Sequence, residues 1–222
     1  MKIKQIIALV VVVALLMAGS VLVTFAYLTD TQSVRNTFTV GQVKITLDET
    51  AVDANGEPIP DEDRRAENEY HLMPGHTYTK DPKVTVAAGS DESHIRMIVT
   101  IEDYADLCAA YGKQEGELSL LDLIPGGQLN EGWSLVEQTN NVFECRYADT
   151  VTAESDIPAL FEKIYLASTV SQNNLEKLGE MEIVVVAHAI QADGFNGNAE
   201  LAWAAFDAEL GGETDQTPVG GQ

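Results

Sequence analysis

The side chains best suited to metal binding or nucleophilic catalysis are four histidines and two cysteines, namely His71, His76, His94, His188, Cys108 and Cys145. The sequence has no HExxH pattern, so the helical zinc-protease arrangement of two ligands and a general base is absent. His71 and His76 share a segment with Asp81, which leaves two alternatives: a metal site in a loop, or ordinary exposed side chains. His188 lies inside an apolar run, where we expect a core histidine with satisfied hydrogen bonds.

Other catalytic patterns are also missing from the sequence. There is no GxSxG nucleophile elbow and no phosphate-binding glycine pattern, and no histidine lies near Cys108 in the sequence to activate it. The acidic run Asp61-Glu62-Asp63 lacks the glycine and the distal glutamate of an EF-hand loop, so we expect a solvated loop, with calcium binding as the alternative. The sequence therefore predicts a protein that is not an enzyme and that holds no cofactor or metal.

The charge balance excludes several classes of partner. The 222 residues include 35 acids and 13 bases, which gives a formal net charge of −22. Binding to nucleic acid or to anionic lipid needs a basic face, so we expect neither partner. Hydrophobic residues make up 45% of the chain, which is enough for the core of one good-sized domain.

The first 26 residues have the pattern of a secretory signal peptide. Two early lysines precede an uncharged apolar run over 6–25, and Thr24 and Ala26 supply small side chains before a cleavage position at Tyr27. The alternative is an uncleaved membrane anchor, because the run approaches the roughly 20 residues that span a bilayer. In either case the rest of the chain lies outside the cytoplasm, and after cleavage we expect a secreted protein with no membrane contact.

Export bears on the two cysteines, Cys108 and Cys145. Their separation fits no zinc pattern, and two cysteines cannot form a disulfide framework. An oxidising compartment permits one bridge between them. The alternative is two small buried side chains.

The body of the chain, 27–210, consists of short segments with strand character separated by turns. Segment 37–47 alternates, with Val43, Ile45 and Leu47 on one face, which predicts a half-buried strand interrupted at Gly41. Further strands are predicted at 83–88, 94–102, 133–137, 142–148, 161–166 and 182–191, the last of them apolar enough to be covered on both faces.

Leu- and Ala-rich segments interrupt the strand pattern. The insertion 103–125 holds two predicted short helices at 104–111 and 118–123, and an amphipathic helix is predicted at 199–210. An acidic loop is expected at 48–69 and a flexible tail at 211–222. The predicted fold class is mainly β, an antiparallel β-sandwich with short helical insertions after the signal peptide.

Three segments together resemble a known family. They are Ala26-Tyr27-Leu28-Thr29-Asp30 with Asn36-Thr37-Phe38-Thr39-Val40-Gly41, then Leu72-Met73-Pro74-Gly75-His76-Thr77-Tyr78-Thr79-Lys80-Asp81, and finally 187–195 with Ala202-Trp203. Their order and spacing resemble the TasA/camelysin family of biofilm-matrix proteins from Gram-positive bacteria. The positions that match the family motifs are Asp30, Asn36, Thr37, Gly41, Pro74, Gly75 and Lys80, whereas His76 stands where the family usually has an acid.

The resemblance implies a jelly-roll-like sandwich, processing by a SipW-type signal peptidase, and assembly into extracellular fibres. In the best-known relatives the N-terminal segment inserts as a strand into the next subunit. The corresponding segment here is 27–40, with Leu28, Val34, Phe38 and Val40 as the candidate donor residues. The alternative for Phe38 and Val40 is that they belong to the subunit's own first strand.

The sequence thus favours a secreted structural subunit of matrix fibres, whose partner is a second copy or a related subunit. A cell-surface binding module or adhesin is the main alternative. A camelysin-like metallopeptidase is a further alternative, which the missing zinc motif disfavours.

Overall fold

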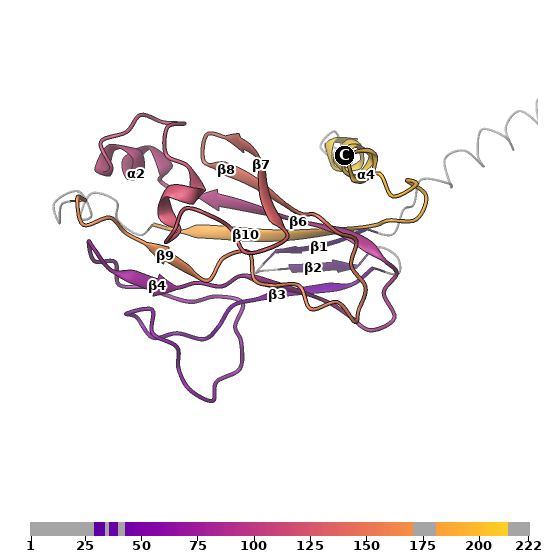
Figure 1. Cartoon of the computed structure of the whole chain (residues 1–222), viewed down its shortest axis with the longest axis horizontal. Helices are drawn as coiled ribbons and strands as arrows, with labels where there is room; N and C mark the ends of the chain where they lie inside the picture. Colours follow the sequence, from indigo (N-terminus) through magenta and orange to yellow (C-terminus); the bar gives the residue numbers. More distant parts are fainter. Residues whose placement is uncertain (1–28, 34–35, 40–42, 171–180, 213–222) are drawn as a thin grey trace, which may run out of the picture.

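The computed structural model describes residues 29–33, 36–39, 43–170 and 181–212, and these form a mainly β protein with antiparallel sheets (Figure 1). The expected signal peptide at 1–26, with its cleavage position between Ala26 and Tyr27, lies outside the described residues. So does most of the tail expected at 211–222.

The largest sheet has six strands in the order β2-β1-β10-β6-β8-β7, and every neighbouring pair is antiparallel. The strands are β1 (Thr29–Ser33), β2 (Asn36–Thr39), β6 (Ser93–Ile101), β7 (Trp133–Thr139), β8 (Val142–Tyr147) and β10 (Ile183–Gln191). The two longest strands, β6 and β10, lie at the centre and pair along nine residues each.

Two small sheets provide the other wall of the core. One pairs β3 (Ile45–Asp48) with β5 (Lys83–Val86), and the other pairs β4 (Thr77–Thr79) with β9 (Lys163–Tyr165). Side chains from these strands and from the six-stranded sheet form one hydrophobic cluster, which includes Ile45, Tyr78, Val99, Phe143 and Ala187. In Figure 1 the short strands β3 and β4 lie below the broad sheet that carries β6 and β10.

The alternation expected around Val43 is present, but the single strand expected over 37–47 is not. Val43, Ile45 and Leu47 are buried and Lys44 and Thr46 are exposed, as an alternating strand requires. However, β2 and β3 belong to different sheets, so the chain leaves one sheet and enters another between Thr39 and Ile45. A period-two pattern continues across such a crossing, because it reports which side chains face the core and not which strand they pair with.

The insertion between β6 and β7 is helical, as its composition predicts. Helix α2 (Tyr104–Ala110) buries Leu107 and Cys108, and the 3-10 helix η1 (Leu120–Leu123) replaces the predicted helix at 118–123. Ser119 begins η1 with a capping box, because its side chain accepts from a backbone N–H of the first turn while Asp122 accepts from the Ser119 backbone.

A turn at Asn140 and Asn141 joins β7 to the antiparallel β8. Asn140 has a φ of 51°, a left-handed conformation that asparagine tolerates better than most residues. Two hydrogen bonds join Asn141 to Ile101: the Asn141 side-chain amide donates to the Ile101 carbonyl, and the Asn141 carbonyl accepts from the Ile101 N–H. The turn is therefore attached to the end of β6.

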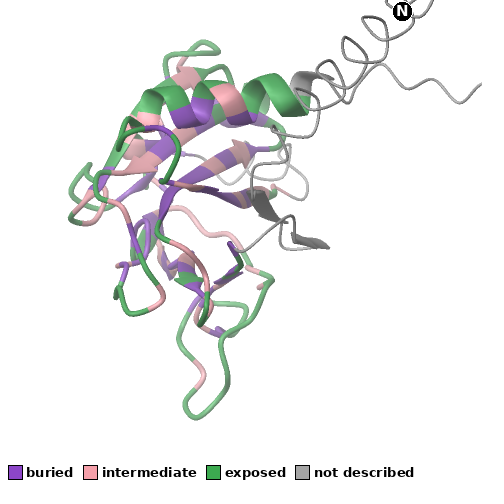
Figure 2. Cartoon of the chain, turned by 90° about the vertical axis from the view of Figure 1, so that its right-hand side faces the viewer, coloured by how far each residue is buried: buried purple, intermediate pink, exposed green. Residues whose placement is uncertain are grey.

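Helix α4 (Ala199–Gly212) covers the face of the six-stranded sheet that points away from the main core. It forms a second hydrophobic cluster in which Trp203 and Phe206 pack with Ile190 of β10. Figure 2 shows its buried residues facing the sheet and its exposed residues facing outward. The apolar character of β10 follows from this cover, because the strand is enclosed on both faces where α4 lies over it.

Candidate functional site

The candidate site is the edge of the six-stranded sheet where the N-terminal segment pairs. β1 pairs with β10 in the register Thr29 to Ile190 through Ser33 to Val186, and β2 pairs with β1 as the outer strand. The N-terminal segment therefore lies as a hairpin against the most apolar strand of the chain. We call this pair of strands the N-terminal hairpin.

The two strands on either side of β10 differ in composition and in length. β1 reads TDTQS and contains no apolar residue, whereas β6 on the other side of β10 reads SHIRMIVTI. β1 has five residues and β6 has nine. A five-residue strand whose sequence contains no apolar residue offers fewer backbone hydrogen bonds and less apolar surface than a nine-residue, largely apolar strand, so we expect the β1–β10 ladder to be the weaker of the two.

The candidate donor residues lie partly in this hairpin. Phe38 belongs to β2 and is paired with Thr31 of β1, so its backbone lies in the chain's own sheet. Leu28, Val34 and Val40 lie outside the described residues. Of the N-terminal motif positions, Asp30 lies in β1, Asn36 and Thr37 lie in β2, and Gly41 is also outside the described residues.

The second motif, around Pro74 and Gly75, forms a turn that ends at the buried Lys80. Gly75 has a φ of +76°, and a Cβ atom there would lie 3.2 Å from the Cβ of Ser168, so a side chain at this position would be strained and crowded. The Gly75 N–H donates to the Leu166 carbonyl at 2.7 Å, which ties the turn to the segment after β9. The motif thus marks a turn that positions β4 beside β9.

Lys80 makes a buried ion pair at the base of the acidic loop. Its Nζ lies 2.6 Å from Oε1 of Glu49, and the two side chains are 8% and 5% exposed. Asn68, near the end of the loop, donates from Nδ2 to the other Glu49 oxygen at 3.4 Å. The Tyr70 ring lies 5.9 Å from Nζ, and burial, with smaller contributions from Glu49 and Asp81, raises the pKa of Tyr70. These four side chains, Glu49, Asn68, Tyr70 and Lys80, form what we call the lysine cluster.

Arg64 closes the same loop from the solvent side. Its guanidinium pairs with Asp48 and with Asp81, the latter at 2.7 Å, and it donates to the backbone carbonyls of both residues. Asp81 in turn accepts from the backbone N–H and the hydroxyl of Thr50. Desolvation by burial acts to lower the pKa of Arg64, but the hydrogen bonds that Arg64 donates to Asp81 and Asp48 outweigh it, so the pKa is raised. The loop expected as a solvated segment is therefore held firmly at both ends.

Arg96 attaches helix α4 to the sheet. Its guanidinium lies 4.6 Å from the Trp203 ring centroid and pairs with Asp207 at 2.5 Å. Its Nε donates to Nδ1 of His188 at 3.1 Å, and the His188 ring packs on Phe206 with centroids 4.9 Å apart. Burial first, and the charge of Arg96 second, lower the pKa of His188 to about 4. His188 is thus the core histidine that the sequence predicts.

The other histidines do not come together as metal ligands. His71 is exposed, and His76 packs against Tyr78 and forms a hydrogen bond of 2.9 Å with the Asn55 carbonyl. His94 is buried, and burial lowers its pKa. Among the described residues, no group of three or more His, Cys, Asp or Glu side chains could hold a metal ion.

Asp61, Glu62 and Asp63 are all exposed, and Glu62 pairs with Arg65. Cys108 and Cys145 are buried and unbridged. Burial raises the pKa of Cys145 to about 12, so its thiol is a poor nucleophile at neutral pH. These residues therefore behave as a solvated loop and as small core side chains.

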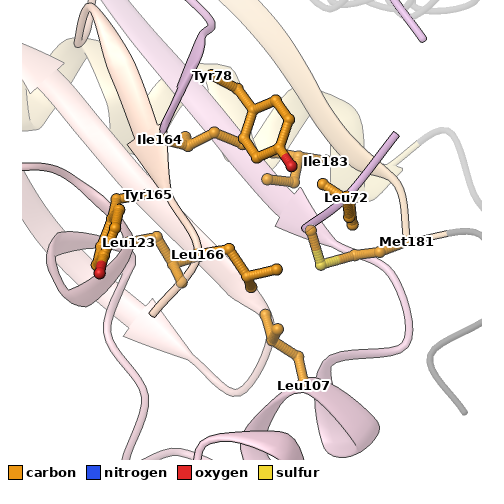
Figure 3. Close-up of a pocket in the computed structure, with 9 residues that line it drawn as sticks. All are labelled: Leu72, Tyr78, Leu107, Leu123, Ile164, Tyr165, Leu166, Met181 and Ile183. Atoms are coloured by element: carbon orange, nitrogen blue, oxygen red, sulfur yellow. The ribbon is translucent and has the colours of Figure 1, made fainter. Parts of the chain in front are cut away.

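A crevice between the small sheets and the helical insertion is lined by seven aliphatic or methionine side chains and two tyrosines (Figure 3). The Tyr78 hydroxyl within it donates to the His71 carbonyl and accepts from the Met73 N–H. The lining contains no carboxylate, histidine, serine or cysteine. A catalytic pocket needs convergent polar groups, and this crevice does not offer them.

Comparison with protein-family models, with curated proteins and with solved structures finds no match to this chain. Within the described part of the chain, every helix is too short or too polar to cross a bilayer.

Sequence reasoning missed the lysine cluster and the Arg96 site. Lys80 and Glu49 are 31 residues apart, and Arg96 and Asp207 are 111 apart, so no local spacing reports either contact. A usable signal for Arg96 was its place between Ile95 and Met97 in a strand with many apolar residues, because a charge at a buried strand position needs a partner.

Proposed function

We propose that this chain is an exported structural subunit of extracellular, biofilm-matrix fibres, similar to the TasA/camelysin proteins. In this proposal the body is a jelly-roll-like antiparallel β-sandwich. Subunits join head to tail when the N-terminal segment 27–40 of one subunit takes the place of the N-terminal hairpin of the next. The signal peptide directs export, and a SipW-type signal peptidase frees the N-terminus.

The observation that supports this proposal is the pairing of a polar strand, β1, with the apolar strand β10. A ladder with little apolar burial opens at a lower free energy than the rest of the sheet. Once β1 leaves, β10 presents a row of unpaired N–H and C=O groups at a sheet edge. An extended segment from a second copy can then pair with that edge by β-augmentation.

The geometry of such an exchange produces a filament. The donating segment and the accepting edge are different surfaces of the subunit, so the contact is heterologous and does not close on itself. The net charge of −22 opposes side-by-side association of subunits, which leaves strand exchange as the specific contact. Before cleavage, an N-terminus held in the membrane cannot reach another subunit, so export controls assembly.

The test is binding of the N-terminal segment in trans. A version of the chain that lacks 27–40 should bind a synthetic peptide of sequence 27–40 in a one-to-one complex, measured by calorimetry. A peptide with the same composition in scrambled order is the control. Folded protein that binds neither peptide, or both equally, would contradict exchange at the β10 edge.

A variant pair tests the same edge in the complete chain. Thr31→Pro/Gln32→Pro removes one ladder N–H facing β10 and one facing β2, because neighbouring residues of a strand point their N–H groups to opposite sides. Thr31→Val/Gln32→Val keeps both N–H groups and is the matched control. We expect the proline variant to lose assembly and the valine variant to keep it.

A further inference from the structure

The lysine cluster places the three groups that an amide-forming reaction needs around one buried carboxylate. The amine of Lys80 lies 2.6 Å from Glu49 Oε1, and the side-chain amide nitrogen of Asn68 lies 3.4 Å from Glu49 Oε2. Lys80 and Glu49 are 7% and 4% exposed as whole residues. One carboxylate therefore reaches both an amine and a carboxamide in a site that excludes most water.

We propose that Lys80 and Asn68 form an intramolecular isopeptide bond, with Glu49 as the general base and acid. Glu49 takes a proton from the Lys80 ammonium, and the free amine attacks Cγ of Asn68. The new Nζ–Cγ bond forms, the Cγ–Nδ2 bond breaks, and Nδ2 leaves as ammonia after gaining the proton that the attacking nitrogen loses. The ammonia takes the proton held by Glu49, so ammonium departs and the Glu49 carboxylate is restored.

The hydrogen bonds of Asn68 favour this reaction at each atom. Oδ1 accepts from the Val52 N–H at 3.1 Å, which places a backbone donor where negative charge develops during attack. Nδ2 donates to the Thr50 carbonyl at 2.9 Å and to Glu49, so the leaving nitrogen lies beside the group that supplies its proton. The Tyr70 ring beside Nζ limits water access, which protects the free amine from solvation.

The bond would hold the base of the acidic loop covalently to the residue that follows β4. Lys80 is one of the positions that match the second family-like motif, and in the folded chain its side chain pairs with Glu49 and lies beside the Tyr70 ring. A covalent link at this point would resist the loosening of the loop and of β4 that heat or force would cause.

Peptide mapping of the purified full chain tests the proposal directly. Trypsin cleaves the uncross-linked chain after Arg65 and Lys80 and releases 66–80. An isopeptide at Lys80 blocks that second cleavage, so the expected product is 66–83 with a mass lower by one ammonia molecule. Further fragmentation should assign the link to Lys80 and Asn68. Release of unmodified 66–80 from folded protein overturns the proposal. So does 66–83 joined to peptide 45–64 with the loss of one water, which would indicate a link to Glu49 instead.

Variants separate the reaction from folding. Glu49→Gln should leave the 66–80 peptide unmodified, and Lys80→Arg should abolish the mass loss. Glu162→Gln is the matched control, because the Glu162 carboxylate also accepts from an asparagine amide, that of Asn130, at 2.8 Å. Among the described residues that carboxylate forms no ion pair with a lysine, and its carbonyl, which accepts from the Lys80 N–H, is kept in the variant. Near-ultraviolet circular dichroism confirms that each variant is folded. Loss of the link in Glu162→Gln, or its persistence in folded Glu49→Gln, contradicts the assigned roles.

Discussion

Protonation of His188 at acidic pH should weaken the attachment of helix α4 to the six-stranded sheet. The His188 ring is 8% exposed and lies between Arg96, which donates to Nδ1, and the Phe206 ring. Protonation would place a second positive charge beside Arg96. The anionic groups that face this site are Asp207, which pairs with Arg96 from α4, and Glu144, which lies 3.6 Å from Arg96. Both already pair with Arg96.

The sign of the effect follows from the lowered pKa. The pKa of His188 falls from an ordinary value of 6.5 to about 4 in the folded chain. The unfolded chain therefore binds a proton between these values and the folded chain does not. The contribution of neutral His188 to the free energy of unfolding is fully present above pH 6.5. It decreases as the pH drops toward 4 and changes no further below pH 4. One pKa unit corresponds to about 1.4 kcal/mol, so the whole loss is about 3 kcal/mol.

The assay is urea unfolding at pH 7 and at pH 4.5, followed by tryptophan fluorescence. Carboxylates also titrate in this range, so the informative quantity is the difference between the chain and His188→Asn, which keeps an acceptor for Arg96 but does not titrate. We expect the free energy of unfolding to fall between these pH values by about 2.5 kcal/mol more in the chain than in the variant. Equal losses in both proteins would refute the reasoning, and so would an NMR titration that places the His188 pKa near 6.5.

Four further substitutions test the packing of the fold and the closure of the acidic loop. Phe143→Ala removes a fully buried ring and should lower the free energy of unfolding by about 3–5 kcal/mol in chemical denaturation. Gly132→Ala should lower the free energy of unfolding by more than about 1 kcal/mol, because φ is +83° and the new Cβ would lie 2.5 Å from the Tyr147 ring. Gly89→Ala is the comparison: φ is +84° but no atom lies near the new Cβ, so this variant should show the cost of backbone strain alone. Arg64→Ala removes the solvent-side closure of the acidic loop, so limited proteolysis should cut that loop faster than in the unaltered chain, and an unchanged rate would show that Arg64 does not hold it.

The sequence was a good guide to the strands, because side-chain alternation reports burial. It placed β6, β7, β8 and β10 to within a few residues, and the apolar run of β10 correctly indicated cover on both faces. The strand at 161–166 is present but shorter, as β9. The segment 37–47 was wrong as one strand, since alternation carries no information about which sheet a residue joins.

The sequence was a poor guide to the polar contacts, because they join residues far apart in the chain. The Arg96 site combines β6, β10 and α4, and the lysine cluster combines the end of β3, the acidic loop and the end of β4. Each buried charge in these sites depends on a partner that only the fold brings near. The prediction that His188 is a satisfied core side chain is confirmed because it needed only the apolar run around it.

The fibre proposal depends on the N-terminal segment more than on any other feature. The measurement that tests it most directly is negative-stain electron microscopy of purified protein that begins at Tyr27, beside a version that lacks Tyr27–Asn36. The account predicts filaments from the first protein and monomers from the second. It also predicts monomers from a third protein in which the sequence of Tyr27–Asn36 is scrambled. Monomers from both proteins, or filaments from both, would contradict strand exchange by the N-terminal segment as the basis of assembly.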